Sequence, residues 1–297
     1  MNELGTSTVE LLGRQGVDVA DVRRVVCTAL EEDLRYGPDA TTSATVGTTA
    51  VATGSVVPRE RGVLAGVGVA LAVLDTVLGP GAYRVLARAE DGDQVRPGAA
   101  VLSVTATAAG LLTAERTMLN LLCHLSGVAT ATGAWVRAVE GTHCRIRDTR
   151  KTLPGLRQLQ KYAVRAGGGV NHRMGLGDAT LIKDNHVVAA GSVVAALKAV
   201  RSAAAELPCE VEVDSLEQLD EVLAENAELV LLDNFDVPST AEAVRRRDAR
   251  APGTFLESSG GLTLDVAAAY AATGVDYFAV GALTHSVTVL DLGLDLR

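Results

Sequence analysis

The chain has 297 residues, of which 48% are hydrophobic and 3% aromatic, and it carries 27 Lys and Arg against 36 Asp and Glu. This length predicts about two domains, each large enough for a core of its own, in a globular protein of ordinary composition. The net charge of −9 argues against a general nucleic-acid or membrane-surface binder.

The four cysteines and the N-terminal segment indicate a cellular compartment. The cysteines are far apart in sequence and include no CxxC pair, which argues against both a zinc site and a disulfide framework. The acidic start, MNELGTSTVELLG, lacks the apolar core of a signal peptide. We therefore expect a reducing, cytoplasmic location with no membrane partner.

The first 110 or so residues indicate a mixed α/β domain. Apolar residues at helical spacing predict a helix over 21–34, with Asp21 as its N-cap, and a second helix over 68–79 that ends at Gly79. Strand-like runs over 83–108, broken by the turn signals DGD and RPG, predict an antiparallel sheet. We expect an α/β sandwich domain over 1–125.

A long helix is predicted over 111–139. Its uncharged part, 117–136, is long enough to cross a bilayer, but Asn120, His124 and several hydroxyl residues make that costly. We interpret this stretch as a buried helix of a globular fold.

From residue 144 onward, short strand-like runs alternate with helical segments. The runs are CRIRDT, ATLIKD, CEVEVD, ELVLLDNF, TFLESSGG and DYFAVGAL, and the helical segments are 155–167, 189–206, 215–225, 239–249 and 263–273. Runs that are apolar on both faces are typical of parallel strands covered by helices. About six such repeats are too few for a closed eight-stranded barrel. We predict an incomplete, open (β/α) barrel over 126–285, with residues 286–297 packing back on the first domain.

One window of this acidic chain is strongly basic. Residues 145–186 hold nine Lys or Arg and only three acids, a local charge of +6. Polar side chains follow the predicted strands: Arg150 and Lys151 after the first, Lys183 after the next, Asp233 after a later one. Because (β/α) barrels build their active sites at the carboxyl ends of the strands, these groups are expected to meet at one mouth.

Other residues support an anion-binding mouth. Glu210 and Glu212 share one face of a strand, where an acid must be paired or act as a ligand. His172 and Arg173 follow the glycine run AGGGV, and SSGGL (258–262) and VGAL (280–283) end the last two strands, where such barrels hold phosphate. Arg157, Lys161 and Arg165 recur every four residues, and for them we favour a solvated helix face. The predicted ligand carries phosphate and carboxylates.

The long motifs resemble one known family. They are EDLRYGPDATT, LLTAERTMLNLLCHLSGVAT, RDTRKTLPGLRQLQKYAVRAGGGVNHRMGLGDATLIKDNH, EVEVDSLEQL, LVLLDNF, ESSGGL and GVDYFAVGALTHS. In this order they resemble the quinolinate phosphoribosyltransferases over nearly the whole chain. Residues 36–42 carry one residue more than the usual form of that motif.

The resemblance implies an activity and its residues. The activity is phosphoribosyl transfer from 5-phosphoribosyl 1-pyrophosphate to quinolinate with decarboxylation, with Mg²⁺ as cofactor. The implied quinolinate-binding cations are Arg150, His172, Arg173 and Lys183, with Arg116 supplied across a homodimer of shared active sites. Lys151, Glu212 and Asp233 match the pyrophosphate side, Glu212 and Asp233 holding the metal directly or through water, and Ser259, Gly260, Gly261 and Gly281 match the 5′-phosphate loops. Lys151, Lys183, Glu212 and Asp233 are the implied catalytic residues.

Two alternatives stay open at this point. A related enzyme of the same fold could use another nitrogen heterocycle, such as nicotinate or a molybdate-linked substrate. A non-catalytic anion sensor or nucleic-acid binder belongs to a different class, but the basic window contains a single aromatic residue, Tyr162, and so lacks the stacking groups that nucleic-acid binding needs.

Overall fold

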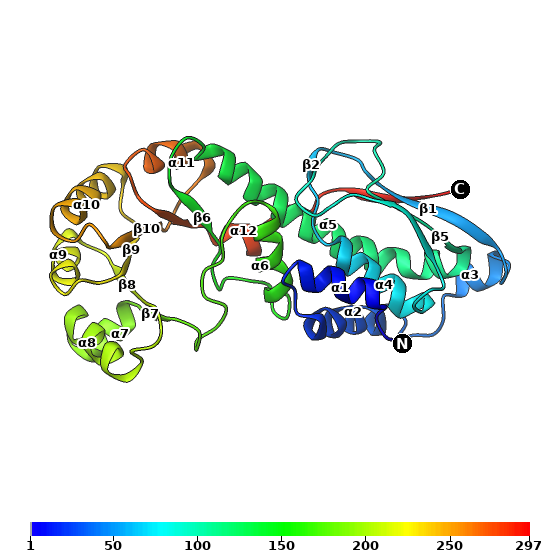
Figure 1. Ribbon diagram of the computed structural model, residues 1–297, viewed down its shortest axis with the longest axis horizontal. Coiled ribbons are helices and arrows are strands. Elements are labelled where there is room, and N and C mark those ends of the chain that lie inside the picture. The colour runs from blue at the N-terminus through cyan, green and yellow to red at the C-terminus, as the bar shows by residue number, and fades with distance from the viewer. Residues whose placement is uncertain (1) are drawn as a thin grey trace. The chain divides into compact units, whose positions relative to one another are not determined.

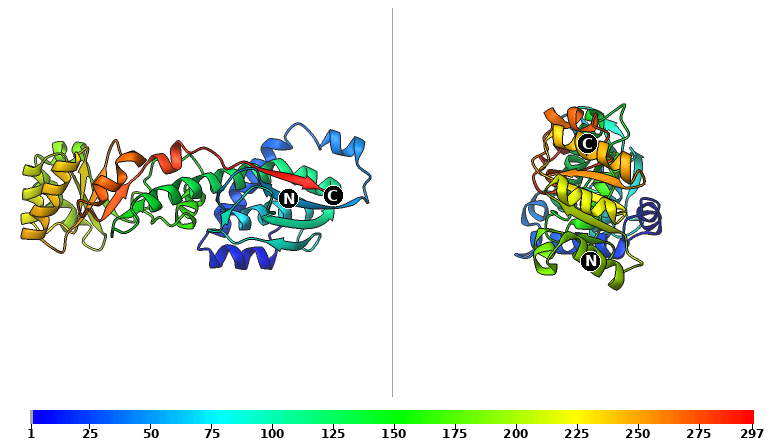
Figure 2. Two further views of the ribbon diagram at one scale, coloured as in Figure 1. Left: turned by 90° about the horizontal axis from the view of Figure 1, so that it is seen from above. Right: turned by 90° about the vertical axis from the view of Figure 1, so that its left-hand side faces the viewer.

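The computed structural model describes residues 2–297, which form two compact units (Figure 1). Unit 1 contains residues up to 133, together with 152–168 and 283–297, and unit 2 contains 134–151 and 169–282. Each unit has its own sheet and its own covering helices, seen from two further directions in Figure 2.

Unit 1 is built on a four-stranded antiparallel sheet in the order β12-β1-β5-β3, with a short ribbon of β2 and β4. Its strands are β1 (Val51–Pro58), β2 (Gly62–Val63), β3 (Arg84–Arg88), β4 (Gln94–Val95), β5 (Leu102–Thr107) and β12 (Leu292–Leu296). Its helices are α1 (Thr6–Arg14), α2 (Val19–Asp33), α3 (Ala40–Thr45), α4 (Val67–Leu78), the larger part of α5 (Ala108–Ala138), α6 (Arg157–Ala166) and nearly all of α12 (Ala282–His285).

The alternation of β5 explains how this sheet joins the core. Leu102, Val104 and Ala106 are buried on one face of the strand. On the other face, Ser103 and Thr105 pair through their hydroxyls with Ser55 and Thr53 of β1 at 3.0 and 3.1 Å. A two-residue period of this kind gives a strand one apolar and one polar face.

Asp91 ties several segments of unit 1 together. Its carboxylate accepts hydrogen bonds from the backbone N–H groups of Gly66 (2.8 Å) and Val67 (3.0 Å), which open helix α4, and from the Gln15 side chain (3.1 Å). The hydroxyl of Tyr162 on α6 donates to the same carboxylate, and burial together with the Asp91 charge raises the pKa of that phenol. A carboxylate at a helix N-terminus satisfies free N–H groups and complements the helix dipole.

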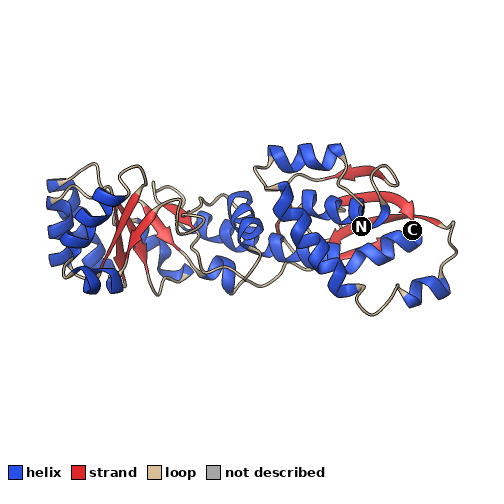
Figure 3. Ribbon diagram, turned by 90° about the horizontal axis from the view of Figure 1, so that it is seen from below, coloured by secondary structure: helices blue, strands red, loops and turns tan. Residues whose placement is uncertain are grey.

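Unit 2 contains a six-stranded parallel sheet in the order β6-β11-β10-β9-β8-β7. The strands are β6 (Arg145–Arg147), β7 (Thr180–Ile182), β8 (Cys209–Val213), β9 (Leu229–Asp233), β10 (Phe255–Ser259) and β11 (Tyr277–Ala279). The helices are α7 (Asp184–Ala190), α8 (Val193–Ala203), α9 (Leu216–Ala224), α10 (Val237–Arg250) and α11 (Leu264–Ala271). Figure 3 shows helices of this unit along one side of its strands.

The sheet of unit 2 is a barrel opened between β6 and β7. Among residues 2–297, β6 pairs with β11, the last strand of this sheet in chain order, and on its other side it makes only an isolated bridge, Arg147 to Val170. Residues 171–179 therefore run as a loop where a closed barrel would continue its sheet. This confirms the predicted open (β/α) architecture, and the six strands fall where the sequence predicts them.

Several predictions about the elements need correction. The N-cap of α2 is Asp18, whose side chain accepts from the N–H of Ala20 at 2.9 Å, so the helix begins before Asp21. Lys161 is fully buried, because α6 is buried on nearly all sides over 159–164, and the predicted solvated stripe is wrong at that position. Residues 152–168 pack with unit 1, and residue 125, after which the sequence predicts the domain boundary, lies inside α5.

Over the part of the chain that the structure describes, no single helix is long and apolar enough to cross a membrane. Only α7 and α8 taken together, across a 90° bend, reach that length and composition. The stretch 117–136 lies in α5 and is largely buried, as predicted.

Replacing Asp91 with Ala is expected to lower the free energy of unfolding by about 2–4 kcal/mol, since several donors lose one charged acceptor. Chemical denaturation monitored by circular dichroism measures this change. Asp93→Ala is the matched control, because among residues 2–297 the Asp93 side chain accepts only from the N–H of Glu90, at an exposed turn. It should cost less than about 1 kcal/mol. Equal losses in the two variants would contradict the role of Asp91.

Candidate active site

A cavity of about 650 Å³ lies at the carboxyl ends of the strands of unit 2. It is lined by Thr149, Arg150, Lys151, His172, Arg173, Leu181, Lys183, Asp184, Glu212, Leu231, Asp233, Asn234, Glu257, Ser259, Gly260 and Ala279. All of these residues belong to unit 2, so one compact body carries the whole lining. The position agrees with the rule for (β/α) folds.

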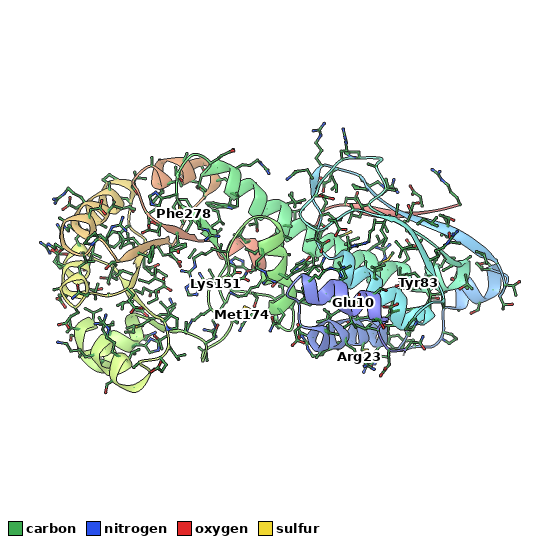
Figure 4. All side chains as sticks on the ribbon, viewed as in Figure 1. Glu10, Arg23, Tyr83, Lys151, Met174 and Phe278 are labelled. Carbon is green, nitrogen blue, oxygen red and sulfur yellow. The ribbon has the colours of Figure 1, made fainter. Side chains whose placement is uncertain are left out.

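Four cations of the basic window reach this cavity. Arg150 and Lys151 come from the loop after β6, Arg173 from the loop that precedes β7, and Lys183 from the residue directly after β7. In Figure 4, Lys151 and Met174 mark the two loops. Burial and the nearby charge of Arg150 together lower the pKa of Arg173. A pair of guanidinium groups that repel each other is stabilised when an anion binds between them.

Two carboxylates stand at the ends of β8 and β9. Glu212 forms an ion pair with Lys183, and Asp233 accepts a hydrogen bond from the side chain of Asn234 at 2.8 Å. Burial, and then the charge of Glu212, raises the pKa of Asp233. These two acids repel each other and face an opening, and carboxylate oxygens are the ligands that Mg²⁺ prefers.

The end of β10 brings backbone close to the cavity. Gly260 has a φ of +87°, and a Cβ there would lie 2.1 Å from Oδ1 of Asn234. The N–H of Asn234 donates to the carbonyl of Ser259 at 2.9 Å, which locks the two strand ends together. Only glycine fits this position without displacing Asn234, so the main chain lines the cavity directly.

Beneath the cations lies a buried ionic layer. Glu257 is fully buried and accepts a hydrogen bond from Nη1 of Arg147 at 2.5 Å. Nε2 of His172 is 2.7 Å from Oε2 of Glu210 and 3.7 Å from Oε1 of Glu257. Burial raises the pKa of both glutamates to about 7; the neighbouring charge of Glu210 adds to this at Glu257, and Arg147 opposes it at both.

The cavity brings together most of the predicted site residues. Arg150, Lys151, His172, Arg173, Lys183, Glu212, Asp233, Ser259 and Gly260 line it, whereas Gly261, Gly281 and Arg116 do not. Arg116 is exposed on α5, one turn from the exposed Asn120. The buried side of the helix is formed by other residues, such as Met118 and Leu119.

Other residues of the site were not predicted. Glu257 sits in the motif ESSGG, but its side chain could be assigned to the cavity only once β10 was placed between β9 and β11. Arg147 of β6 belongs to the basic window, where the sequence pattern assigns it no role. The sequence signal for both is a charged residue inside a short apolar strand, which also singled out Glu210.

Comparison with known proteins identifies the family. The model of the quinolinate phosphoribosyl transferase C-terminal domain matches residues 128–295, and that of the N-terminal domain matches residues 39–126. The chain belongs to the quinolinate phosphoribosyl transferase family. The join between the two matches falls inside α5.

Individual relatives agree with this membership. The chain is 70% identical over 274 residues to the nicotinate-nucleotide pyrophosphorylase [carboxylating] of Mycobacterium leprae, covering 92% of this chain and 96% of that one. It resembles the solved nicotinate-nucleotide pyrophosphorylase from Francisella tularensis with a TM-score of 0.89 and 35% identity, covering 95% and 98% of the two chains. NadC from Streptococcus pyogenes gives a TM-score of 0.88 at 35% identity, with 95% and 99% covered.

Proposed function

We propose that this member of the quinolinate phosphoribosyl transferase family transfers phosphoribosyl from 5-phosphoribosyl 1-pyrophosphate to quinolinate with loss of CO2. The products are nicotinate mononucleotide and pyrophosphate, a step of de novo NAD synthesis. The observation that carries the proposal is the gathering of Arg150, Lys151, Arg173 and Lys183 around one cavity of an otherwise acidic chain. Such a cavity suits two substrates that are both multiply anionic.

Quinolinate is a dianion with adjacent carboxylates, and it is assigned to the cations from the opened side of the barrel. Arg150, Arg173 and Lys183 supply charge-assisted donors, and Arg173 lies close enough to Arg150 to feel its charge. Two carboxylates offer each guanidinium a partner of matching planar geometry. Nicotinate has only one carboxylate, so it would leave part of this cationic set uncompensated.

Phosphoribosyl pyrophosphate is assigned to the remaining part of the cavity. Lys151 and the acids Glu212 and Asp233 face its pyrophosphate and ribose hydroxyls, while Ser259 and Gly260 offer a hydroxyl and close backbone for its 5′-phosphate. Gly261 continues the loop after β10, and Gly281 lies after β11. Both are proposed to offer backbone N–H groups to the 5′-phosphate. Backbone donors in glycine loops are common phosphate ligands.

A magnesium ion would fit between Glu212 and Asp233. Burial, and then the charge of Glu212, raises the pKa of Asp233, and a divalent cation held directly or through water would offset the repulsion between the two carboxylates. When bound, the ion would supply charge neutralisation for the departing pyrophosphate.

The side chains of the cavity account for the chemistry. The cations orient quinolinate so that its ring nitrogen faces C1 of the ribose, and the nitrogen forms the new bond as the bond to pyrophosphate breaks. The ring nitrogen is then positive and stabilises the electron pair left on C2 when CO2 departs, and a proton from water then takes the place of CO2 at C2. Lys151 compensates the leaving pyrophosphate, and the Lys183–Glu212 pair fixes the cation nearest the reacting ring.

The active protein is proposed to be a cytoplasmic homodimer in which Arg116 completes the neighbour's site. The exposed side chain of Arg116 has no ion-pair partner among residues 2–297. It is also not among the residues that line the cavity in unit 2 of the same chain. A two-fold dimer would create two equivalent composite sites. The small-molecule substrates and the acidic surface charge disfavour nucleic-acid and membrane partners.

Turnover should be seen with quinolinate and not with nicotinate, and Arg150→Ala or Arg173→Ala should lower quinolinate affinity roughly 10²–10⁴-fold while the fold is kept. Product analysis and calorimetric titration measure these outcomes. The affinity should fall because each variant loses the charge-assisted hydrogen bonds that its arginine makes to the quinolinate carboxylates. A folded Arg150→Ala variant with normal quinolinate affinity would remove the central assignment.

Glu212→Gln and Asp233→Asn should impair the use of phosphoribosyl pyrophosphate and magnesium more than the capture of quinolinate. Steady-state KM for each substrate, measured across a magnesium titration, separates the effects. The charge at the proposed metal site is lost while the shape is kept. Selective loss of quinolinate binding in either variant would give these acids another role.

Arg116→Ala and Lys183→Ala chains should each be inactive as homodimers, and mixing them so that subunits exchange should restore activity. The heterodimer would contain one intact site, and so about half the activity of a wild-type dimer. Differently tagged subunits allow the heterodimer to be purified and assayed. An inactive heterodimer would place Arg116 outside the neighbour's site.

A further inference from the structure

The buried layer beneath the cavity has no direct role in the proposed chemistry. Arg147 pairs with the fully buried Glu257, and its guanidinium stacks over the ring of Tyr277, 4.8 Å from the centroid. Glu210, which is 3% exposed, keeps both carboxylate oxygens buried without a hydrogen bond of good geometry within residues 2–297. Buried acids at such a density are costly and call for a function.

His172 connects this layer to Arg173. The backbone N–H of Arg173 donates to Nδ1 of His172 at 2.7 Å. A ring nitrogen that accepts a hydrogen bond carries the lone pair, so the proton of the neutral imidazole is on Nε2. Nε2 lies 2.7 Å from Oε2 of Glu210, which is ion-pair distance, so both ring nitrogens lie against groups of the protein.

This tautomer excludes one attractive alternative. His172, Glu210 and Glu257 have the residue types and the proximity of a metal site. A metal on Nε2 would require the proton to be on Nδ1, where it would collide with the N–H of Arg173. The cation of Arg147 already neutralises Glu257. The cluster is therefore organised around a proton on His172.

We propose that Glu210 and Glu257 are positioning residues for quinolinate, acting through His172 on Arg173; this rests on the proposed function. The carboxylate of Glu210 packs against Nε2, with Glu257 beside it, and so fixes the ring, whose Nδ1 accepts the N–H of Arg173. Asp148 secures the same turn by accepting the N–H of His172 at 2.9 Å. His172 thus supports the carboxylate-binding arginine and does not itself donate to the substrate.

The side chain of Arg173 depends on this support. Its Nη1 donates to the carbonyl of Ala179 at 3.2 Å, while its Nε is buried and makes no hydrogen bond among the residues described, leaving that donor for a substrate carboxylate. Arg150 repels the guanidinium, and the charge of Glu210 attracts it. Without the layer beneath, the two arginines would separate before quinolinate arrives.

The test compares two substitutions of one residue. Glu210→Gln keeps an acceptor for Nε2–H, and the KM for quinolinate should stay within about threefold of wild type. Glu210→Leu removes the acceptor, and the KM for quinolinate should rise about 10-fold or more, equivalent to 1.4 kcal/mol, with the KM for phosphoribosyl pyrophosphate within about twofold. In an Arg173→Ala background, Glu210→Leu should add nothing further, because the effect passes through Arg173.

A buried ion pair elsewhere in unit 2 provides the control. Asp276 pairs with the buried Arg247 at 2.8 Å, ahead of the first residue of β11 and so away from the carboxyl strand ends that form the cavity. Asp276→Leu should lower the melting temperature without changing either KM. If it raised the KM for quinolinate as Glu210→Leu does, the effect would be general destabilisation and the proposal would fail.

Ring nitrogen NMR of the wild-type protein tests the geometry even if Glu210→Leu does not fold. Histidine labelled with 15N, with His172 assigned by a His172→Gln variant, should show a neutral Nε2–H tautomer. A protonated ring or an Nδ1–H tautomer would overturn the proposal. The results also distinguish failure of the proposed function from failure of this inference. Unchanged quinolinate affinity in Arg173→Ala would defeat the proposed quinolinate site. Lost affinity in Arg173→Ala together with unchanged affinity in Glu210→Leu would defeat only the positioning role.

Discussion

Like charges can be held close together in a protein only if opposite charges compensate them, and the site of this chain is organised by that constraint. Arg150, Arg173 and Lys183 converge on one cavity. Glu212 pairs with Lys183 in the cavity, and Glu210 attracts Arg173 from beneath. The cations are thus held ready for a dianion, and binding exchanges internal attraction for stronger contacts to carboxylates.

The opened barrel makes this arrangement possible. A closed barrel would place a strand between β6 and β7, with its side chains committed to the alternation of the sheet. Here residues 171–179 run as a loop in that place, and His172 and Arg173 reach the interior from it. Glycines 167–169 precede the loop, and Asp148 anchors it to the end of β6. The break in the sheet therefore provides the basic side of the cavity.

The fixed geometry extends from the site to the whole of unit 2. Phe278 of β11, labelled in Figure 4, packs edge-on against Trp135 and Tyr270, with ring centroids 6.5 and 6.4 Å away. This aromatic contact holds β11 in place. The residue before Phe278 in that strand, Tyr277, stacks against the guanidinium of Arg147. Packing outside the sheet thus stabilises the ionic layer inside it.

The sequence alone determined the repeating β–α pattern, the excess of cations in one window and most of the cavity lining. These follow from local rules, since parallel strands place their carboxyl ends at one edge and apolar periodicity marks their helices. Tertiary structure decided which faces are covered, and so it buried Lys161, exposed Arg116 and joined 152–168 to unit 1. It also decided that His172 uses both nitrogens within the protein. Such pairings join residues up to 110 positions apart, as in Arg147 and Glu257, and no local pattern encodes which distant partner a buried charge will meet.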